Sequence, residues 1–183
     1  MKVLGDSHTA YDVMREYMII GAELDGKYQI PMLDRYTGHP GEDTVDFKDS
    51  FSLKIKNHRK LTVNFYIHDY EFEKIWNNPD RYLEHLKCFH SVIGPDFSMA
   101  VGENGMPFAM NIYQKYRNHA LSHYLSMNGI KVIPNVSIPP EYCYDWAFDG
   151  VPKRSTVACC TNGRIKSRAS REEFCIGFKE MER

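Results

Sequence analysis

The chain has 183 residues, of which 43% are hydrophobic and 13% aromatic, so it is long enough to bury a core and too apolar to be disordered throughout. Its formal charge of −1 excludes general attraction to a polyanion as the main source of affinity for a partner. No stretch approaches the roughly 18 apolar residues that a membrane span needs, so we expect no membrane association.

The five cysteines are odd in number and show no CxxC spacing, and residues 1–10 carry no apolar segment typical of a secretion signal. We therefore expect a reduced, cytoplasmic protein whose cysteines are mainly small buried hydrophobic side chains. We also expect a single domain over residues 1–183, with an irregular N-terminal extension at 1–60 and a core of βα units at 61–183.

Little regular structure is predicted for the N-terminal extension. Residues 11–21 have helical spacing, and residues 28–32 are expected to be extended because Pro31 disfavours the α conformation at the residue before it. Residues 34–60 are polar and rich in turn residues, except at 51–55, where alternating apolar side chains predict a strand.

The core begins with a predicted βαβ unit. Residues 61–67 are β-branched and aromatic, which predicts a strand, and a helix is expected to follow from about Tyr70. A second helix is expected at 79–87, because proline suits the first position of a helix. The apolar run that begins at Ser91 then returns as a strand, and such units build parallel sheets.

The second strand stops at Gly94 and Pro95, and the chain then delivers Asp96 and Ser98 at this corner. A loop is predicted at residues 99–106. The next elements are a helix at 107–128, a strand at 131–135, a short helix at 139–148, a strand at 155–160 and a closing helix at 171–182.

At least four strands alternating with helices predict an α/β fold with a mainly parallel sheet, either open or closed into an incomplete barrel. In such folds the loops that follow the carboxyl ends of the strands form the functional site. The corner at residues 94–98 is therefore the expected position of a site.

The long predicted helix at 107–128 has one apolar face and one polar face on a helical wheel. Arg117 lies within the apolar face, where an unpartnered guanidinium is costly, so we expect it to reach an anion such as Asp69 or Asp96. The face expected to be buried consists of Ala109, Ile112, Tyr113, Tyr116, Ala120, Tyr124 and Met127, and the face expected to be exposed consists of Asn111, Gln114, Lys115, Asn118, Ser122 and Ser126.

Several motifs, in this order along the chain, resemble a known family. They are IHDYEFEKIWNNP at 67–79, PDFS at 95–98, YRN at 116–118, GIKVIP at 129–134 and FDG at 148–150. From about residue 27 to the C-terminus the chain is similar to the phage- and mobile-element-associated family known as domain of unknown function 4417. The resemblance implies an α/β fold with a parallel, barrel-like (TIM-like) sheet, left incomplete here because family members continue into a further strand.

The resemblance carries no settled enzymatic activity. The setting of the family in phages and mobile elements implies accessory or anti-defence work in the cytoplasm of a bacterial host. The resemblance extends to type II-A anti-CRISPR proteins of similar length. It therefore implies that the partner is a CRISPR nuclease such as Cas9, or its guide RNA.

Asp69 and Asp96 each follow a strand, and the two strands are expected to be neighbours, so both carboxylates should lie at one edge of the sheet. Two carboxylates with water suit Mg²⁺, and Mg²⁺ suits phosphodiester cleavage. In this interpretation Arg117 stabilises the charge of a phosphate, and the site is completed by Ser98, Asn118, Asn135 and Thr161. In the structural alternative, Asp96 caps the amides of its own loop, Asp69 caps the following helix and Arg117 pairs with one of them.

A basic stretch without acidic residues is the best nucleic-acid feature of the chain, because phosphate contacts come mainly from Lys and Arg. Aromatic residues just before it are available to stack on bases. The alternative is a solvated surface. The basic residues are Lys153, Arg154, Arg164, Lys166, Arg168 and Arg171.

Two further patterns favour structural roles. His119 and His123 are four residues apart on one helix, a spacing that can bind zinc, but the glutamate of the HExxH pattern is absent. Cys159 and Cys160 are adjacent in a predicted strand, so they face opposite ways and cannot act together on one substrate.

Three functions therefore remain open. The first is an anti-CRISPR protein that acts on Cas9 or its guide RNA, including metal-dependent RNA cleavage by Asp69 and Asp96. The second is an enzyme or binding protein for a nucleotide or a phosphorylated metabolite, with Arg117 as an anion clamp. The third is an inhibitor that binds a protein without catalysis. The sequence leaves the substrate and the oligomeric state open.

Overall fold

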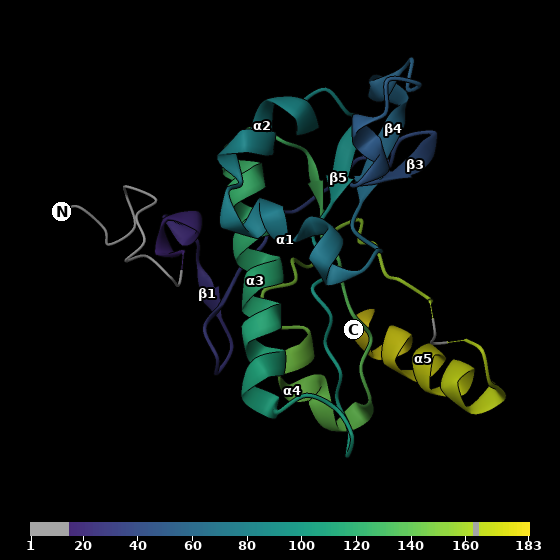
Figure 1. The fold of residues 1–183 in the computed structure, drawn as a ribbon. Coiled ribbons are helices and arrows are strands. Elements are labelled where there is room, and N and C mark those ends of the chain that lie inside the picture. The colour runs from purple at the N-terminus through teal and green to yellow at the C-terminus, as the bar shows by residue number, and fades with distance from the viewer. Residues whose placement is uncertain (1–14, 163–164) are drawn as a thin grey trace.

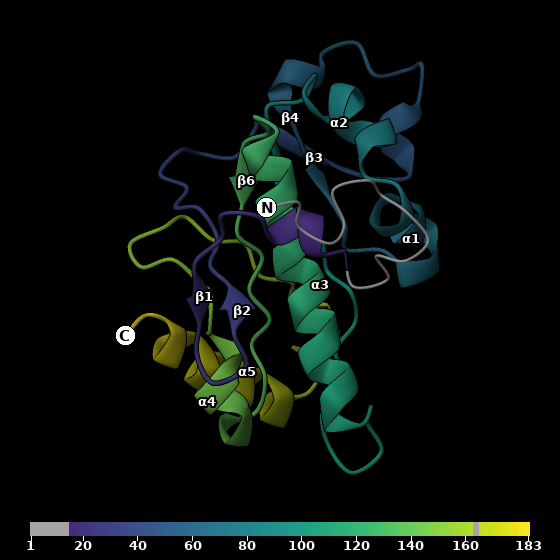
Figure 2. The same cartoon turned by 90° about the vertical axis from the view of Figure 1, so that its left-hand side faces the viewer.

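In the computed structural model, which describes residues 15–162 and 165–183, a long helix, α3 (Phe108–Met127), forms the centre of the molecule. The main sheet and the helices α1 (Asp69–Asn77) and α2 (Asp80–Leu86) lie toward one end of α3, and α4 (Tyr144–Ala147) lies toward the other (Figure 1). A view turned by 90° shows the N-terminal hairpin, formed by β1 (Leu24–Asp25) and β2 (Ile30–Pro31), running along the same helix (Figure 2). The main sheet, α1, α2, α4 and the N-terminal hairpin are thus arranged along one helix.

The main sheet is open and has four parallel strands in the order β3, β4, β5, β6. Backbone pairing places Val63 beside Val92, and Ile93 beside Ile133. The predicted α/β class is confirmed, and the open sheet is the form observed, in place of the barrel-like closure that the family resemblance implied. The strands are β3 (Asp43–Asp46), β4 (Leu61–Asn64), β5 (Ser91–Ile93) and β6 (Val132–Ile133).

Most of the predicted helices are present, and the other elements are short apart from the closing helix. The helices predicted at 79–87, 107–128 and 139–148 are confirmed to within a few residues, which is the usual uncertainty of helix ends. The remaining elements are η1 (Glu16–Ile19), the antiparallel hairpin of β1 (Leu24–Asp25) and β2 (Ile30–Pro31), η2 (Asp49–Phe51), η3 (His58–Lys60), η4 (Glu141–Cys143) and α5 (Arg168–Met181).

Two strand predictions were wrong. Residues 51–55 form no strand, because Phe51 belongs to a turn of 3-10 helix and its ring packs edge-on against Phe47. The edge strand is instead β3, which the polar composition of residues 34–60 concealed and which pairs with β4 along its whole length. Residues 155–160 contribute only one bridge, between Ala158 and Asn135.

The apolar core lies between the sheet and the helices that cover it. A row of buried phenyl rings runs through it, with centroid separations of 4.9 Å from Phe47 to Phe65, 5.3 Å from Phe65 to Phe72 and 4.7 Å from Phe72 to Phe97. Phe97 belongs to the corner after β5, so burial of its ring fixes the neighbouring polar residues at the surface. All five cysteines are free thiols.

The buried surface of α3 is wider than predicted: Ala120 is buried as expected, but most of the polar face expected to be exposed is buried too. Ala109 and Met127 are exposed, although both belong to the predicted buried face. The neighbours of the helix are loops and strand ends whose backbone groups need partners, so polar side chains are buried against them and bonded to them. The buried polar residues include Asn111, Gln114, Lys115, Asn118 and Ser122.

In the part of the chain that the structure describes, no helix combines the length and the apolar character that crossing a bilayer requires.

Candidate functional site

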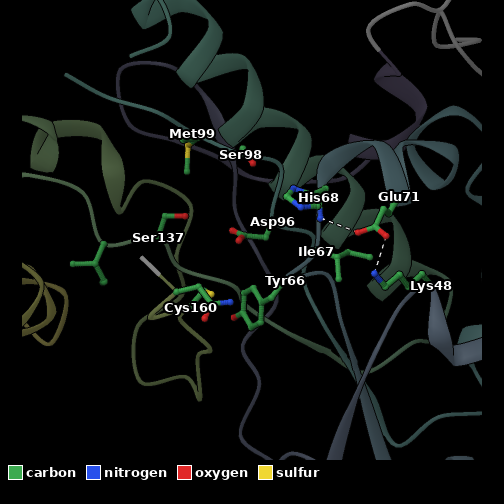
Figure 3. A pocket seen from close by; sticks show the side chains of 12 residues that line it. Lys48, Tyr66, Ile67, His68, Glu71, Asp96, Ser98, Met99, Ser137 and Cys160 are labelled. Carbon is green, nitrogen blue, oxygen red and sulfur yellow. Dashed lines mark hydrogen bonds and ion pairs between the residues drawn. The ribbon is translucent and has the colours of Figure 1, made fainter. Parts of the chain in front are cut away.

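An open pocket of about 520 Å³ lies where β4, β5 and β6 end, at the edge of the sheet where the sequence predicted a site. Figure 3 shows Asp96 near its middle, with Lys48 and Glu71 on one side and Ser137 on the other. The lining residues are Lys48, Tyr66, Ile67, His68, Glu71, Asp96, Ser98, Met99, Ser137, Ile138, Cys160 and Asn162.

The corner that carries Asp96 and Ser98 is held by α3. The side-chain amide of Asn118 donates to the carbonyl of Phe97 (3.2 Å) and accepts from its N–H (2.7 Å). Gln114 donates to the carbonyl of Ser98 at 3.3 Å. Asn118, predicted as part of a catalytic shell, thus clamps the backbone of the corner.

Asp96 lies in a hydrogen-bonded group on the pocket wall. The Asn135 amide donates to Asp96 Oδ1 at 2.8 Å and to the carbonyl of Pro95 at 3.1 Å, and the Tyr66 hydroxyl donates to Asn135 Oδ1 at 3.0 Å. Burial, with the nearby charge of Asp96, raises the pKa of Tyr66, so the phenol stays protonated. Burial also raises the pKa of Cys160, so its thiol is a poor nucleophile.

Asp69 begins α1 and is bonded to the same corner, but it does not line the pocket. Its carboxylate accepts from the Ser98 hydroxyl at 2.7 Å and from the Ser98 N–H at 3.1 Å, and Gln114 donates to it at 3.4 Å. The carboxylate therefore ties α1 to the loop after β5.

Arg117 reaches neither of the two expected partners. Its guanidinium pairs with Glu73, with Nη2 2.6 Å from both carboxylate oxygens, and donates to Gln114 Oε1 at 3.0 Å. It also stacks on aromatic rings, with Cζ 3.6 Å from the Phe97 centroid and 4.9 Å from the Trp76 ring. The prediction that Arg117 has an anionic partner is correct, but that partner is Glu73, one turn into α1.

A metal site at Asp69 and Asp96 stays a prediction. Among residues 15–162 and 165–183 there is no group of three or more His, Cys, Asp or Glu side chains placed to hold a metal ion. The rings of His119 and His123 are buried, and each lies within hydrogen-bonding distance of a backbone carbonyl, of Pro31 (2.8 Å) and of Ile20 (3.3 Å).

The rim of the pocket contains residues that the sequence did not single out. Lys48 Nζ lies 2.7 Å from Glu71 Oε1, and this ion pair lowers the pKa of Glu71. The ring of His68 lies nearly parallel to that of Tyr70, at 9° and 5.7 Å between centroids. Lys48 follows β3 by two residues, so recognition of β3 would have placed it at this edge.

The basic residues that the structure describes are exposed and divide between two segments. Lys153 and Arg154 lie beside residues 35–38, where Thr156 N–H donates to the Tyr36 carbonyl at 2.7 Å, whereas Arg168 belongs to α5 and pairs with Glu172 at 2.8 Å. Lys166 and Arg171 are exposed around the start of α5, and Arg164 lies outside the described residues. Nucleic-acid binding by these residues stays a prediction.

Comparison with known proteins gives a family but no activity. The family described as domain of unknown function (DUF4417) matches residues 22–183. The chain is 34% identical over 119 residues to the Gene 1 protein of Mycobacterium phage L5 and 30% identical over 119 residues to that of Mycobacterium phage D29. These alignments cover 65% of this chain but 51% and 43% of the phage proteins, so the chain spans about half the length of the curated relatives it matches. No solved structure is significantly similar to the chain.

Proposed function

We propose, from the premise that the chain belongs to the DUF4417 family and has mycobacteriophage relatives, that it is an accessory protein that binds a nucleoside or nucleotide in the strand-end pocket. The observation that carries the proposal is the fixed position of Asp96 and Tyr66, both bonded to Asn135, on the wall of this pocket. Carboxylates positioned in this way suit the hydroxyl groups of a ribose.

The balance of charge and shape in the pocket favours the sugar and base over a bare phosphate. Asp96 and Glu71 lie in the same lining as Lys48 and His68, so the pocket has no excess of positive charge. Its volume of about 520 Å³ is in the range of small-molecule sites. The exposed ring of His68 in the lining, with the exposed ring of Tyr70 nearly parallel to it, offers a surface on which a base can stack.

Anti-CRISPR activity is a second proposal. It is supported by the phage relatives and by the exposed basic side chains of Lys153, Arg154, Lys166 and Arg168, which suit a guide RNA. In this case the pocket takes one nucleotide of the RNA, and RNA cleavage requires Mg²⁺ at Asp69 and Asp96. A non-catalytic inhibitor would keep its effect after both aspartates are replaced by asparagine.

Calorimetric titration with adenosine, guanosine, cytidine, uridine and their 5′-monophosphates tests the first proposal. Asp96→Asn is expected to weaken binding by about tenfold or more, since hydrogen bonds to charged groups are worth about 1.5–3 kcal/mol. Asp145→Asn, at an exposed position on α4, is the matched control and should bind as the unmodified protein does. Absence of binding by all eight compounds, or equal affinities for Asp96→Asn and the unmodified protein, would refute the proposal.

The anti-CRISPR proposal is tested separately. Cas9 loaded with guide RNA is incubated with the protein, with and without Mg²⁺, and both guide integrity and DNA cleavage are measured. Reduced DNA cleavage supports the proposal, and guide loss that depends on Mg²⁺ and on Asp96 supports the nuclease form. An intact guide together with undiminished DNA cleavage excludes it.

A further inference from the structure

A second groove, separate from the strand-end pocket, lies at the other end of α3. It has a volume of about 550 Å³ and is bounded by the loop at 101–106, the first turn of α3, η4 and α4. The three aromatic residues in its lining are Phe108, Tyr142 and Trp146. We call it the aromatic groove.

The aromatic rings form a floor and walls. Trp146 is 2% exposed and belongs to a small buried cluster, and the Phe108 ring meets it edge-on at 85° with 5.7 Å between centroids. Phe108 and Tyr142 remain 49% and 67% exposed, which is costly for side chains of this size. Two exposed rings and one buried ring therefore line the same open volume.

A carboxylate and an amide group belong to the lining of the groove. Glu103 lies in the tight turn that the Gly105 N–H closes on the carbonyl of Gly102 at 3.0 Å, so its exposed carboxylate is carried at the edge of the groove. Asn111 is 1% exposed and donates to the carbonyls of Ala100 and Met106, but its buried Oδ1 has no hydrogen-bond partner among the described residues. None of the described residues that line the groove is Lys, Arg or His.

Aromatic faces, a carboxylate and an unsatisfied amide oxygen together suit a positive charge. A cation over Trp, Tyr or Phe is attracted by the ring quadrupole, and quaternary and methylated ammonium groups are recognised in this way. A carboxylate at the mouth adds a charge-assisted contact.

We propose that the aromatic groove binds an organic cation of the alkylammonium class through Phe108, Tyr142, Trp146 and Glu103. Either a free amine or a lysine side chain of a protein partner carries this chemistry. The proposal uses none of the residues of the strand-end pocket, so it stands or fails independently of nucleoside binding.

The ligand test compares choline with its neutral isostere 3,3-dimethylbutan-1-ol by NMR titration of the full chain. Choline is expected to bind about tenfold more tightly, because a cation–π contact is worth about 0.5–2 kcal/mol and the isostere lacks it. Spermidine and a short peptide containing trimethyllysine form the other two arms, and the tighter of them identifies the source of the cation. Equal binding of choline and the isostere, or no binding by any cation, overturns the proposal.

Variants at exposed positions complete the test without disturbing the core. Tyr142→Phe keeps the ring and should retain affinity, whereas Tyr142→Leu should lose about fivefold. Glu103→Gln should lose a similar factor and reduce the dependence of binding on salt. Circular dichroism confirms that each variant is folded. Unchanged choline affinity in both Tyr142→Leu and Glu103→Gln would also overturn the proposal.

Discussion

The two members of the ion pair between Arg117 and Glu73 differ in burial, so replacing one should cost more stability than replacing the other. The side chain of Arg117 is 9% exposed, whereas that of Glu73 is 41% exposed. Glu73→Gln leaves a buried guanidinium without a counter-charge, while Arg117→Met leaves a carboxylate that water can reach. We therefore expect Glu73→Gln to be the more destabilising of the two substitutions.

The magnitudes follow from the same geometry. Breaking a fully buried pair costs about 3–5 kcal/mol, and the partial exposure of Glu73 reduces this to about 1.5–3 kcal/mol. In Arg117→Met the new side chain keeps an apolar surface against Phe97 and Trp76, so the loss is mainly the cation–π attraction, about 1 kcal/mol. For a chain of this length these values correspond to decreases in Tm of about 3–12 °C and 2–4 °C.

Urea unfolding at pH 7, followed by circular dichroism, measures both free energies, and the double variant completes the cycle. In the double variant the cost of Glu73→Gln should largely vanish, because no guanidinium remains to be compensated. A larger loss for Arg117→Met than for Glu73→Gln, or a Glu73→Gln variant as stable as the unmodified protein, would refute this account of the pair.

Three further substitutions test other parts of the structure. Asn118→Ala removes both hydrogen bonds to the backbone of Phe97 and should cost about 2–4 kcal/mol of unfolding free energy, measured by urea unfolding. Burial lowers the pKa of Lys115 to about 7, below its unfolded value, so the unfolded chain binds the extra proton above that pH. The unfolding free energy should therefore rise relative to that of Lys115→Met by about 3 kcal/mol between pH 7 and pH 9.5. Gly177→Val places a Cβ 2.5 Å from Ile138 Cγ2, so α5 should detach, which limited proteolysis and hydrogen exchange would detect.

For each of these three predictions, one result would contradict it. Asn118→Ala with unchanged stability would mean that the clamp on the corner contributes nothing. Parallel pH profiles for Lys115→Met and the unmodified protein would show that the lysine titrates normally. Gly177→Val with α5 still protected from proteolysis would show that the close approach is relieved by a small shift.

The sequence predicted the elements that depend on local pattern. The strand at β4, the corner after β5 and the full length of α3 were found because apolar runs, proline and glycine mark them. The edge strand β3 was missed, since a strand with one neighbour and a largely exposed surface needs no apolar alternation, and its pairing with β4 is made by the backbone.

The candidate site was predicted in position but not in detail. The edge of the sheet followed from the order of strands and helices, and Asp96 lies there as expected. The partner of Arg117 was mistaken because Glu73 and Asp69 are one helical turn apart, and the sequence does not fix which of them faces α3. Asn135 was predicted as one of several polar side chains of the site, but its bonds to Asp96 and Tyr66 were not, because they depend on the alignment of β6 with β5.

The two halves of α3 should join the native structure at different times. The N-terminal half offers the rest of the protein mainly hydrogen bonds, and its partners at Ser98, Ala100 and Ala147 come from loops and from α4, which must already be in place. The C-terminal half carries Leu121 and Leu125, which are buried in the main core and give it a driving force for early collapse. Substitutions that shorten polar side chains in the N-terminal half of α3 are therefore expected to accelerate unfolding while leaving the refolding rate nearly unchanged.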